Sequence, residues 1–335
     1  MDLGTSYLGL SLRNPIIVSA SPLSGNVSAI RQLEDAGAGA VVLPSLFEEQ
    51  IREEERLIDE LTNVGADSNP EAGSYFPDAA KYNAGPLGYL ELVARAREAV
   101  DIPVIASLNG TTEAGWIDYA QLIEQAGASA LELNIYRIAS GPGVTSSDAE
   151  AECVALFQAV RSRVELPIAV KLHPYFSAFG ALARQLDEAG ANGLVLFNRL
   201  YQPDIDLARM RWSNDLVLSS AAEIRLGLLW VSLLAGKLPG ASLAAGTGVE
   251  TADEVVKYLL AGADAVMTAS ALLRHGPEYL RSLLADLETW LSAHHFASVT
   301  AIKGLLRSCH PDTEAQERGD YIGSLLGYRG RYVTR

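Results

Sequence analysis

Several polar side chains lie directly after apolar segments of the chain, where catalytic groups are found in many enzymes. Lys171 ends the apolar segment Ile168–Lys171, and Asn134 follows Ala130–Leu133. A lysine at the end of such a segment is costly to bury unless it is paired or used. The sequence therefore allows two interpretations of Lys171. It forms an interior ion pair with Glu132, or it is a functional cation that lies beside a cofactor ring or forms a Schiff base.

Two segments of small residues follow the last apolar stretches of the chain. Gly246-Thr247-Gly248 precedes a predicted helix, and Thr268-Ala269-Ser270 precedes another. Backbone N–H groups without bulky side chains, next to helix starts, form cradles for anions. We therefore expect a phosphate site at this place. The alternative is that the small residues only permit tight turns.

The remaining candidates are amides and small hydroxyls. They are Ser19-Ala20-Ser21, Ser45, Ser107, Asn109 and Asn198. The set holds no carboxylate pair and no cluster of metal ligands, which argues against a glycosidase or a metallohydrolase. His173, in a turn before Pro174, is expected to be structural, and Cys153 is expected to pack inside a helix.

A repeated helix–strand unit must position these residues. Ala-Gly-Ala occurs four times, each time shortly before an apolar strand. The copies are residues 36–38, 126–128, 189–191 and 261–263. Glycine suits the left-handed turn that ends a helix. Ser147 with Glu150, and Thr251 with Glu254, predict capping boxes at two helix starts. Short apolar strands that alternate with amphipathic helices are typical of parallel strands buried on both faces.

The sequence predicts an α/β protein with eight such strands, which favours a closed TIM (β/α)8 barrel. The predicted strands are Ile16–Ser19, Ala40–Leu43, Val104–Ser107, Ala130–Leu133, Ile168–Lys171, Gly193–Leu196, Leu243–Ala245 and Ala265–Met267. Residues 44–102 and 198–218 are insertions after strands 2 and 6. We expect one domain over residues 1–310, and a tail over 311–335 that packs on the barrel or on a neighbouring subunit.

Composition limits the class of protein. Of the 335 residues 49% are apolar, which is ample for a large core. The formal net charge of −15 argues against nucleic acid or an anionic membrane as a partner. There is no signal-peptide pattern and no apolar run of membrane-spanning length. Two cysteines are too few for a disulfide framework or a four-thiolate cluster. We therefore expect a soluble cytoplasmic protein.

Together these segments resemble the dihydroorotate dehydrogenase family of FMN-dependent barrels, over nearly the whole chain up to about Arg307. The order and spacing of the segments carry the resemblance, because no single motif is decisive. The matching segments are Asn14–Ser21, Leu131–Asn134, Val170–Tyr175, Asn198, Leu218–Ser220, Gly246–Thr251 and Thr268–Leu272.

The resemblance implies FMN as the cofactor, with Lys171 by the pyrimidine edge of the flavin and Asn134 near both flavin and substrate. With the strand-end residues it gives a set of predicted cofactor-binding residues. They are Ser19, Ala20, Ser21, Asn109, Asn134, Lys171, Ser219, Ser220, Gly246, Thr247, Gly248, Thr268, Ala269 and Ser270. The predicted substrate-binding residues are Asn83, Asn134 and Asn198.

Two positions depart from the family pattern. The family's lysine after the second strand is replaced by Pro44, and its Cys or Ser base, three residues after the fourth-strand Asn, is replaced by Arg137. A guanidinium does not accept a proton near neutral pH. We expect Arg137 either to bind an anionic substrate group or to point to solvent. The candidate catalytic residues are therefore Lys171, Asn134 and Arg137.

The leading hypothesis is an FMN-dependent oxidoreductase that acts on CH–CH bonds. It would transfer a hydride between a dihydropyrimidine-like or related polar substrate and FMN, in pyrimidine biosynthesis. Two alternatives are a lyase that forms a Schiff base through Lys171 and a flavin-binding pseudoenzyme or partner subunit. The expected partners are a small-molecule substrate, a soluble electron acceptor or redox partner protein, and a second copy of the chain in a homodimer.

Overall fold

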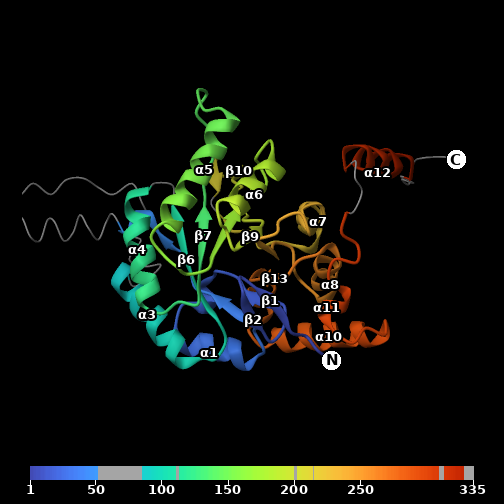
Figure 1. Cartoon of the computed structure of the whole chain (residues 1–335), viewed down its shortest axis with the longest axis horizontal. Helices are drawn as coiled ribbons and strands as arrows, with labels where there is room; N and C mark the ends of the chain where they lie inside the picture. The colour runs from blue at the N-terminus through green and yellow to red at the C-terminus, as the bar shows by residue number, and fades with distance from the viewer. Residues whose placement is uncertain (52–84, 111–112, 200–201, 214, 309–312, 328–335) are drawn as a thin grey trace, which may run out of the picture.

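The structure, a computed structural model, describes residues 1–51, 85–110, 113–199, 202–213, 215–308 and 313–327. Eight parallel strands surround the centre of the molecule (Figure 1). They are β3 (Ile16–Val18), β4 (Ala40–Val42), β6 (Val104–Gly110), β7 (Ala130–Ile135), β8 (Ile168–Leu172), β9 (Gly193–Leu196), β12 (Ser242–Ala245) and β13 (Ala265–Thr268). Each strand pairs with two neighbours, and the pairing of β4 with β6 closes the ring. The predicted TIM barrel is confirmed.

All eight predicted strands are present, and the differences are at their ends. Strands β6 and β7 run further than predicted, so that Asn109 and Asn134 belong to the strands rather than to the loops after them. The four Ala-Gly-Ala glycines have the predicted left-handed backbone, with φ angles of 108°, 86°, 95° and 116° in chain order. The repeat therefore marks the return from each helix to the next strand.

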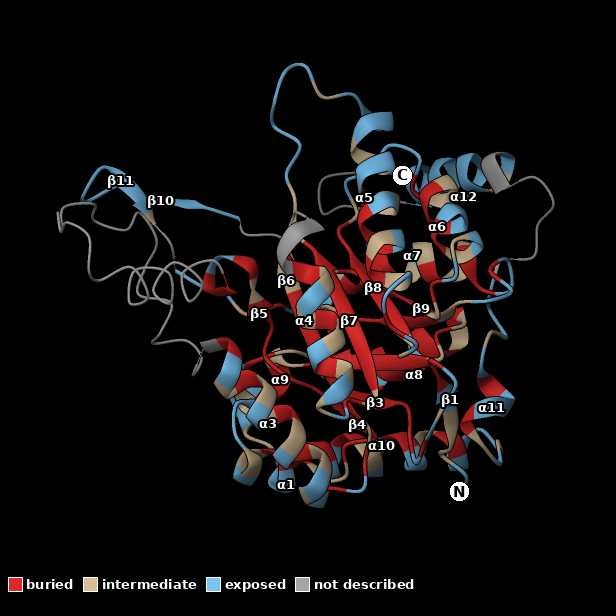
Figure 2. Cartoon of the chain, turned by 60° about the vertical axis from the view of Figure 1, so that its left-hand side comes forward, coloured by how far each residue is buried: buried red, intermediate tan, exposed pale blue. Residues whose placement is uncertain are grey.

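Helices cover the outside of the barrel (Figure 2). The longer ones are α1 (Val27–Asp35), α3 (Gly85–Ala99), α4 (Glu113–Gln125), α5 (Ser146–Arg161), α6 (Phe179–Glu188), α7 (Ile224–Leu234), α8 (Ala252–Ala261) and α10 (Tyr279–Ala293). The short ones are η1 (Pro22–Ser24), η3 (Ala221–Glu223), α9 (Ser270–His275) and α11 (Val299–Ile302). In the chain order each strand is followed by at least one helix, as the (β/α)8 pattern requires.

The predicted insertions are visible in part. Strand β5 (Leu46–Phe47) extends the sheet beside β6, and most of the insertion after the second barrel strand lies outside the described residues. The insertion after the sixth strand contains the antiparallel pair β10 (Asp204–Asp206) and β11 (Arg211–Ser213). This pair projects from the barrel (Figure 2).

The two predicted capping boxes have different outcomes. At α8, Thr251 and Glu254 form the predicted box. At α5 the prediction of Ser147 with Glu150 is wrong, because the helix begins two residues earlier, with Thr145 as N-cap and Asp148 as its partner. The sequence offers Thr and Ser at three successive positions, 145–147, and the spacing alone does not choose among them.

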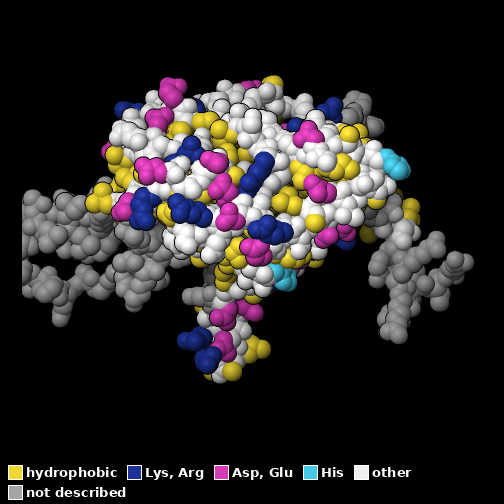
Figure 3. All heavy atoms as spheres, turned by 90° about the horizontal axis from the view of Figure 1, so that it is seen from below, with side chains coloured by type: hydrophobic (Ala, Val, Ile, Leu, Met, Phe, Trp, Pro, Cys, Tyr) yellow, Lys and Arg dark blue, Asp and Glu magenta, His cyan; other side chains and the backbone are white. Residues whose placement is uncertain are grey.

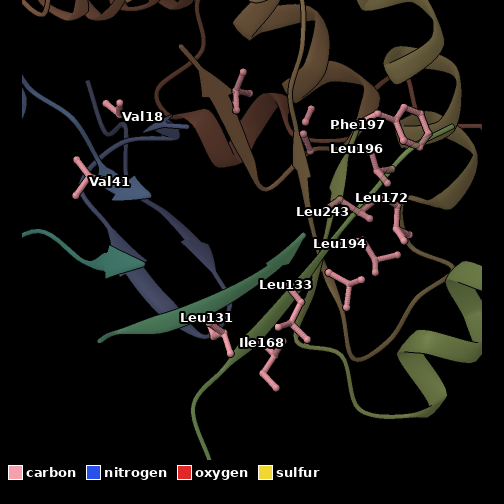
Figure 4. Close-up of a cluster of buried hydrophobic side chains, with 14 of the residues drawn as sticks. Val18, Val41, Leu131, Leu133, Ile168, Leu172, Leu194, Leu196, Phe197 and Leu243 are labelled. Atoms are coloured by element: carbon pink, nitrogen blue, oxygen red, sulfur yellow. The ribbon is translucent and has the colours of Figure 1, made fainter. Parts of the chain in front are cut away.

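Alternation along the strands divides the core into two layers. Outward-facing side chains pack between the strands and the helices (Figure 4). Inward-facing ones form a separate cluster inside the barrel. The inward set from the strands is Ile17, Ala40, Val42, Ile105, Ala130, Ala169, Val195, Ala244, Ala265 and Met267. Five of these ten are alanines, so the barrel interior has room for side chains from elsewhere in the chain.

An N-terminal hairpin fills that room. Strands β1 (Thr5–Tyr7) and β2 (Leu10–Leu12) pair antiparallel, and Tyr7, Leu8 and Leu12 belong to the interior cluster. A Cβ atom placed on Gly193 of β9 would lie 2.5 Å from the Leu8 Cδ2 atom. Glycine at this position therefore permits the hairpin to enter the barrel.

The surface of the barrel carries charged side chains of both signs. On the face in Figure 3, acidic and basic side chains are interspersed. Helix α12 (Thr313–Gly327) lies apart from the barrel in Figure 1, and the Ser308 hydroxyl donates to Gln316 Oε1 at 3.3 Å. The division into a barrel and a tail that packs on it or on a neighbouring subunit stays a prediction. Within the described ranges no helix is both long and apolar enough to span a membrane.

We predict that Gly193→Ala destabilises the protein by about 1–3 kcal/mol, because the added methyl group overpacks the contact with buried Leu8. Gly180→Ala is the matched control, since a Cβ there meets nothing nearer than 3.9 Å and alanine favours the α6 helix. Urea unfolding of the two variants measures both effects. Equal midpoints for Gly193→Ala and the wild type would show that the hairpin does not fill the barrel.

Candidate active site

A cavity of about 160 Å³ lies at the carboxyl ends of the barrel strands. It brings together segments from the start, middle and end of the chain. Eleven of the residues predicted from the sequence line it: Ser19, Ala20, Lys171, Asn198, Ser219, Gly246, Thr247, Gly248, Thr268, Ala269 and Ser270. We call it the cradle cavity. The two loops predicted to bind phosphate thus form one wall, and Lys171 belongs to the same cavity.

The loop after β12 is shaped by its second glycine. Gly248 has a φ of +75°, and a Cβ atom there would lie 2.8 Å from the Ser220 carbonyl oxygen and 2.9 Å from the Ile224 nitrogen. The buried Tyr258 hydroxyl supports the loop from below by donating to the Gly246 carbonyl at 3.0 Å. A side chain at position 248 would therefore displace backbone on both sides.

Hydrogen bonds join this loop to the one after β13. The Gly248 N–H donates to Ser219 Oγ at 3.3 Å, and Ser219 Oγ donates to Ser270 Oγ at 2.9 Å. The Thr268 hydroxyl donates to the Val249 carbonyl at 3.0 Å. A wall of hydroxyls, small residues and backbone N–H groups suits an anion such as a phosphate.

The ion-pair interpretation of Lys171 is confirmed, and its functional role stays a prediction. Its Nζ lies 3.2 Å from Glu132 Oε1, so the interior ion pair exists, and it donates to Ser19 Oγ at 3.4 Å. Lys171 and Ser19 both line the cradle cavity, whereas Glu132 is fully buried. The contact with Lys171 places the Glu132 carboxylate on the inward side of β7. The ammonium is therefore held by the protein and still borders the site.

The candidate amides form a row across three strands. Register pairs Asn109 of β6 with Asn134 of β7, and Asn134 with Lys171 of β8. The Asn198 side-chain amide donates to Asn134 Oδ1 at 2.8 Å, which joins the two predicted substrate residues. Asn83 lies outside the described residues.

Four of the predicted cofactor-binding residues, Ser21, Asn109, Asn134 and Ser220, do not line the cradle cavity. The Ser21 hydroxyl is buried and has no hydrogen-bond partner within the described part of the chain. Ser220 is the N-cap of η3, and its backbone N–H donates to Glu223 Oε1 at 2.9 Å. The cofactor contacts of these four residues stay predictions.

Arg137 lies in a different cavity. This larger cavity, of about 460 Å³, is formed by the segment after β7, helix α5 and the segment after β8. Arg137 forms an ion pair there with Glu152 of α5, and its side chain is 38% exposed. The structure therefore places Arg137 against a neighbouring helix, and its catalytic role stays a prediction.

His173 borders the same cavity as Arg137. Its Nδ1 accepts from the Tyr175 N–H at 3.1 Å, and its ring stacks on Phe176 with centroids 4.4 Å apart. Burial lowers the pKa of the His173 imidazole, which a hydrogen bond with the Arg137 backbone partly offsets. The ring is therefore neutral near pH 7, and Nδ1 carries no proton because it accepts a hydrogen bond.

The sequence interpretation missed Arg199. It lines the cradle cavity, its Nε donates to Glu223 Oε2 at 2.9 Å, and it also bonds the Val217 carbonyl. Its position directly after Asn198 was the available signal. Arg274, behind the wall, donates to the Ser219 carbonyl at 2.6 Å and pairs with Glu250. Arg199 therefore lines the cavity itself, and Arg274 contacts Ser219, one of the residues that line it.

Across the ranges that the structure describes, no three His, Cys, Asp or Glu side chains are grouped to hold a metal ion. Cys153 is buried in α5, as predicted, and burial raises the pKa of its thiol to about 12. It is therefore a packing residue rather than a nucleophile.

Comparison with known proteins gives the family. The "Dihydroorotate dehydrogenase B (NAD(+)), catalytic subunit" of Methanothermobacter thermautotrophicus is 26% identical over 317 residues, covering 90% of this chain and 98% of that protein. The corresponding Pyrococcus furiosus protein is 28% identical over 309 residues, covering 91% and 99%. The "Dihydroorotate dehydrogenase A (fumarate)" of Limosilactobacillus reuteri is 26% identical over 312 residues, covering 89% and 96%.

The family assignment rests on these relatives and on a profile match. Residues 81–291 match the profile described as "Dihydroorotate dehydrogenase". That range spans strands β6 to β13 and includes Lys171, Asn198 and both loops of the cradle cavity. With the barrel and the site as described, the chain belongs to the dihydroorotate dehydrogenase family of oxidoreductases.

Proposed function

We propose that this protein is an FMN-dependent oxidoreductase that transfers a hydride between FMN and a dihydropyrimidine-like or related polar substrate. The observation that carries the proposal is the cradle cavity, in which two loops suited to a phosphate and the cation Lys171 border one space. The family membership supports the dehydrogenase chemistry in general.

The residues of the cavity fit FMN in three respects. Gly248 lines the wall without a side chain, Ser219 and Ser270 line it with hydroxyl side chains, and Lys171 lies at the cavity border. The volume of the cavity is below the roughly 300–1,000 Å³ of typical ligand sites. The cavity would therefore hold one part of a mononucleotide rather than the whole molecule. A dinucleotide such as FAD fits less well, because no strand is followed by a Gly-x-Gly-x-x-Gly motif.

Each group then has a distinct role. Bound FMN would supply the hydride acceptor. Ser219, Ser270 and the Gly248 loop would hold the phosphate, and Lys171 would supply positive charge where the reduced ring is negative. Asn134 and Asn198 would orient a polar substrate through their amides. Arg199 lines the wall, and the N–H groups that Glu223 and Val217 leave unused would be available to an anionic group.

The ion pair of Lys171 bears on the alternatives. An ammonium that donates to Glu132 lacks the free electron pair that attack on a carbonyl requires, which disfavours the Schiff-base lyase. A flavin-binding pseudoenzyme or partner subunit remains the second candidate, because Arg137 occupies the position of the family's base and pairs with Glu152. The homodimer, the cytoplasmic location and the electron acceptor stay predictions.

We predict that the purified protein carries FMN, which mass spectrometry of the released cofactor identifies. Gly248→Val should lower FMN occupancy at least tenfold, because its side chain overlaps the Ser220 and Ile224 backbone. Gly143→Ala, where a Cβ meets nothing within 4 Å, should retain the cofactor. Circular dichroism checks that both variants are folded. Recovery of FAD, or of no flavin from the folded wild type, would refute the proposal.

The missing base gives a second prediction. Wild-type protein should reduce its flavin slowly with dihydroorotate, and Arg137→Cys should accelerate the step, since a general base contributes about 10²–10⁴-fold. Anaerobic stopped-flow measurement of flavin reduction tests this, with Arg163→Cys, an exposed arginine outside both cavities, as the control. Rapid reduction by the wild type would mean that Tyr136, Ser140 or His173 accepts the proton.

A third prediction concerns His173. The unfolded chain takes up a proton on this side chain near pH about 6.5, whereas burial lowers the pKa in the folded protein. Stability should therefore fall as the pH drops below about 6.5, until the folded pKa is reached. His173→Gln should flatten this part of the curve, and exposed Ser177→Ala should not. Urea midpoints between pH 7.5 and about 5 measure the slope. Identical slopes for the wild type and His173→Gln would show that folding does not lower the pKa of His173.

A further inference from the structure

Glu132 is a charged group inside the barrel that the proposed chemistry does not use. Its side chain is fully buried on the inward face of β7, two residues below Asn134. One oxygen, Oε1, lies 3.2 Å from Lys171 Nζ. The other, Oε2, has no hydrogen-bond partner among the described residues. Burying a carboxylate with one oxygen unpaired costs free energy of folding. A buried ion pair by itself adds little net stability, because desolvation of both charges offsets their attraction.

The same polar column continues below Glu132. The Tyr7 hydroxyl of the N-terminal hairpin is fully buried and also lacks a partner in the described part of the chain. Burial raises the pKa of Tyr7, and the charge of Glu132 raises it further. Glu132 therefore lies between the floor of the barrel and the lysine that borders the cradle cavity.

The contacts of Lys171 show how Glu132 reaches the site. An ammonium has three N–H donors, and the acceptors described are Glu132 Oε1 at 3.2 Å and Ser19 Oγ at 3.4 Å. Ser19 and Lys171 line the cradle cavity, so a third donor is available to a ligand there. Glu132 thus fixes the position of the ammonium from below and offsets part of its charge.

We propose that Glu132 is a positioning residue that sets how strongly Lys171 stabilises a bound reduced cofactor. The inference rests on the proposed function, because it takes FMN as the group beside Lys171. A negative charge below the ammonium weakens the field that the reduced, anionic ring experiences. Removing that charge should therefore favour the reduced form, and removing the ammonium should disfavour it.

The midpoint potential of bound FMN tests the proposal directly. Glu132→Gln keeps an oxygen that accepts from Lys171 and removes the charge. It should raise the affinity for reduced relative to oxidised FMN about tenfold, which is about 30 mV for a two-electron couple. Lys171→Met should shift the potential in the opposite direction. Exposed Glu165→Gln matches the change of net charge and should leave the potential unchanged.

An unchanged or lower potential in folded Glu132→Gln would overturn the proposal. If Glu132→Gln does not fold, Glu132→Asp supplies the comparison, because the shorter side chain withdraws the carboxylate from Lys171 Nζ. The potential should then also rise relative to the wild type. A purely structural role for Glu132 would change stability and leave the potential where it was.

The pair can also be tested without flavin. In cofactor-free protein, Lys171→Met leaves Glu132 buried and unpaired, and adding Glu132→Gln should recover at least tenfold in the unfolding equilibrium constant. Strictly additive effects in this urea double-mutant cycle would show that the two side chains do not interact, and would refute the positioning role. Wild-type protein that binds no flavin would refute the proposed function instead, while the cycle still reports on the pair.

Discussion

Strict alternation of side chains along the closed parallel strands governs the rest of the structure. Each strand sends every second residue into the barrel, so the interior is built in levels two residues apart. On β7 these levels are Ala130, Glu132 and Asn134, from the floor to the mouth. The alternation along this one strand therefore places an apolar residue at the floor of the barrel, a charged residue in the middle and an amide at the mouth. On the neighbouring strand β8, register places Ala169 beside Glu132 and Lys171 beside Asn134.

The alanines at the floor of the barrel and the ion pair of Glu132 with Lys171 above them depend on each other. Alanines at the lowest level admit Tyr7, Leu8 and Leu12, and the hairpin excludes solvent from the space below Glu132. Without the hairpin the ion pair of Glu132 and Lys171 would face water, where such pairs contribute little to stability. In the closed barrel the pair is largely buried, so its geometry matters for any charge that binds above it.

The two cavities at the barrel mouth differ in what encloses them. The cradle cavity is formed by strand ends and two loops that hydrogen bonds fasten together through Ser219. The larger cavity beside it contains Arg137 and His173 and lies against α5. The cradle cavity takes Lys171 from the inward face of β8, whereas the larger cavity takes Ile135 from the outward face of β7. A cavity suited to an anion and the cavity that contains Arg137 thus occur within one short region.

Much of the fold could be predicted from the sequence because its signals are local. The Ala-Gly-Ala glycines, the apolar strands and the box of Thr251 with Glu254 each depend on a few adjacent residues. Eleven residues of the cradle cavity could be predicted because strand ends meet at one end of a barrel. Tertiary structure alone decided that Gly193 admits Leu8, that Arg199 borders the cavity and that Arg137 faces Glu152. These contacts join residues distant in the chain, and their geometry arises only when the barrel has closed.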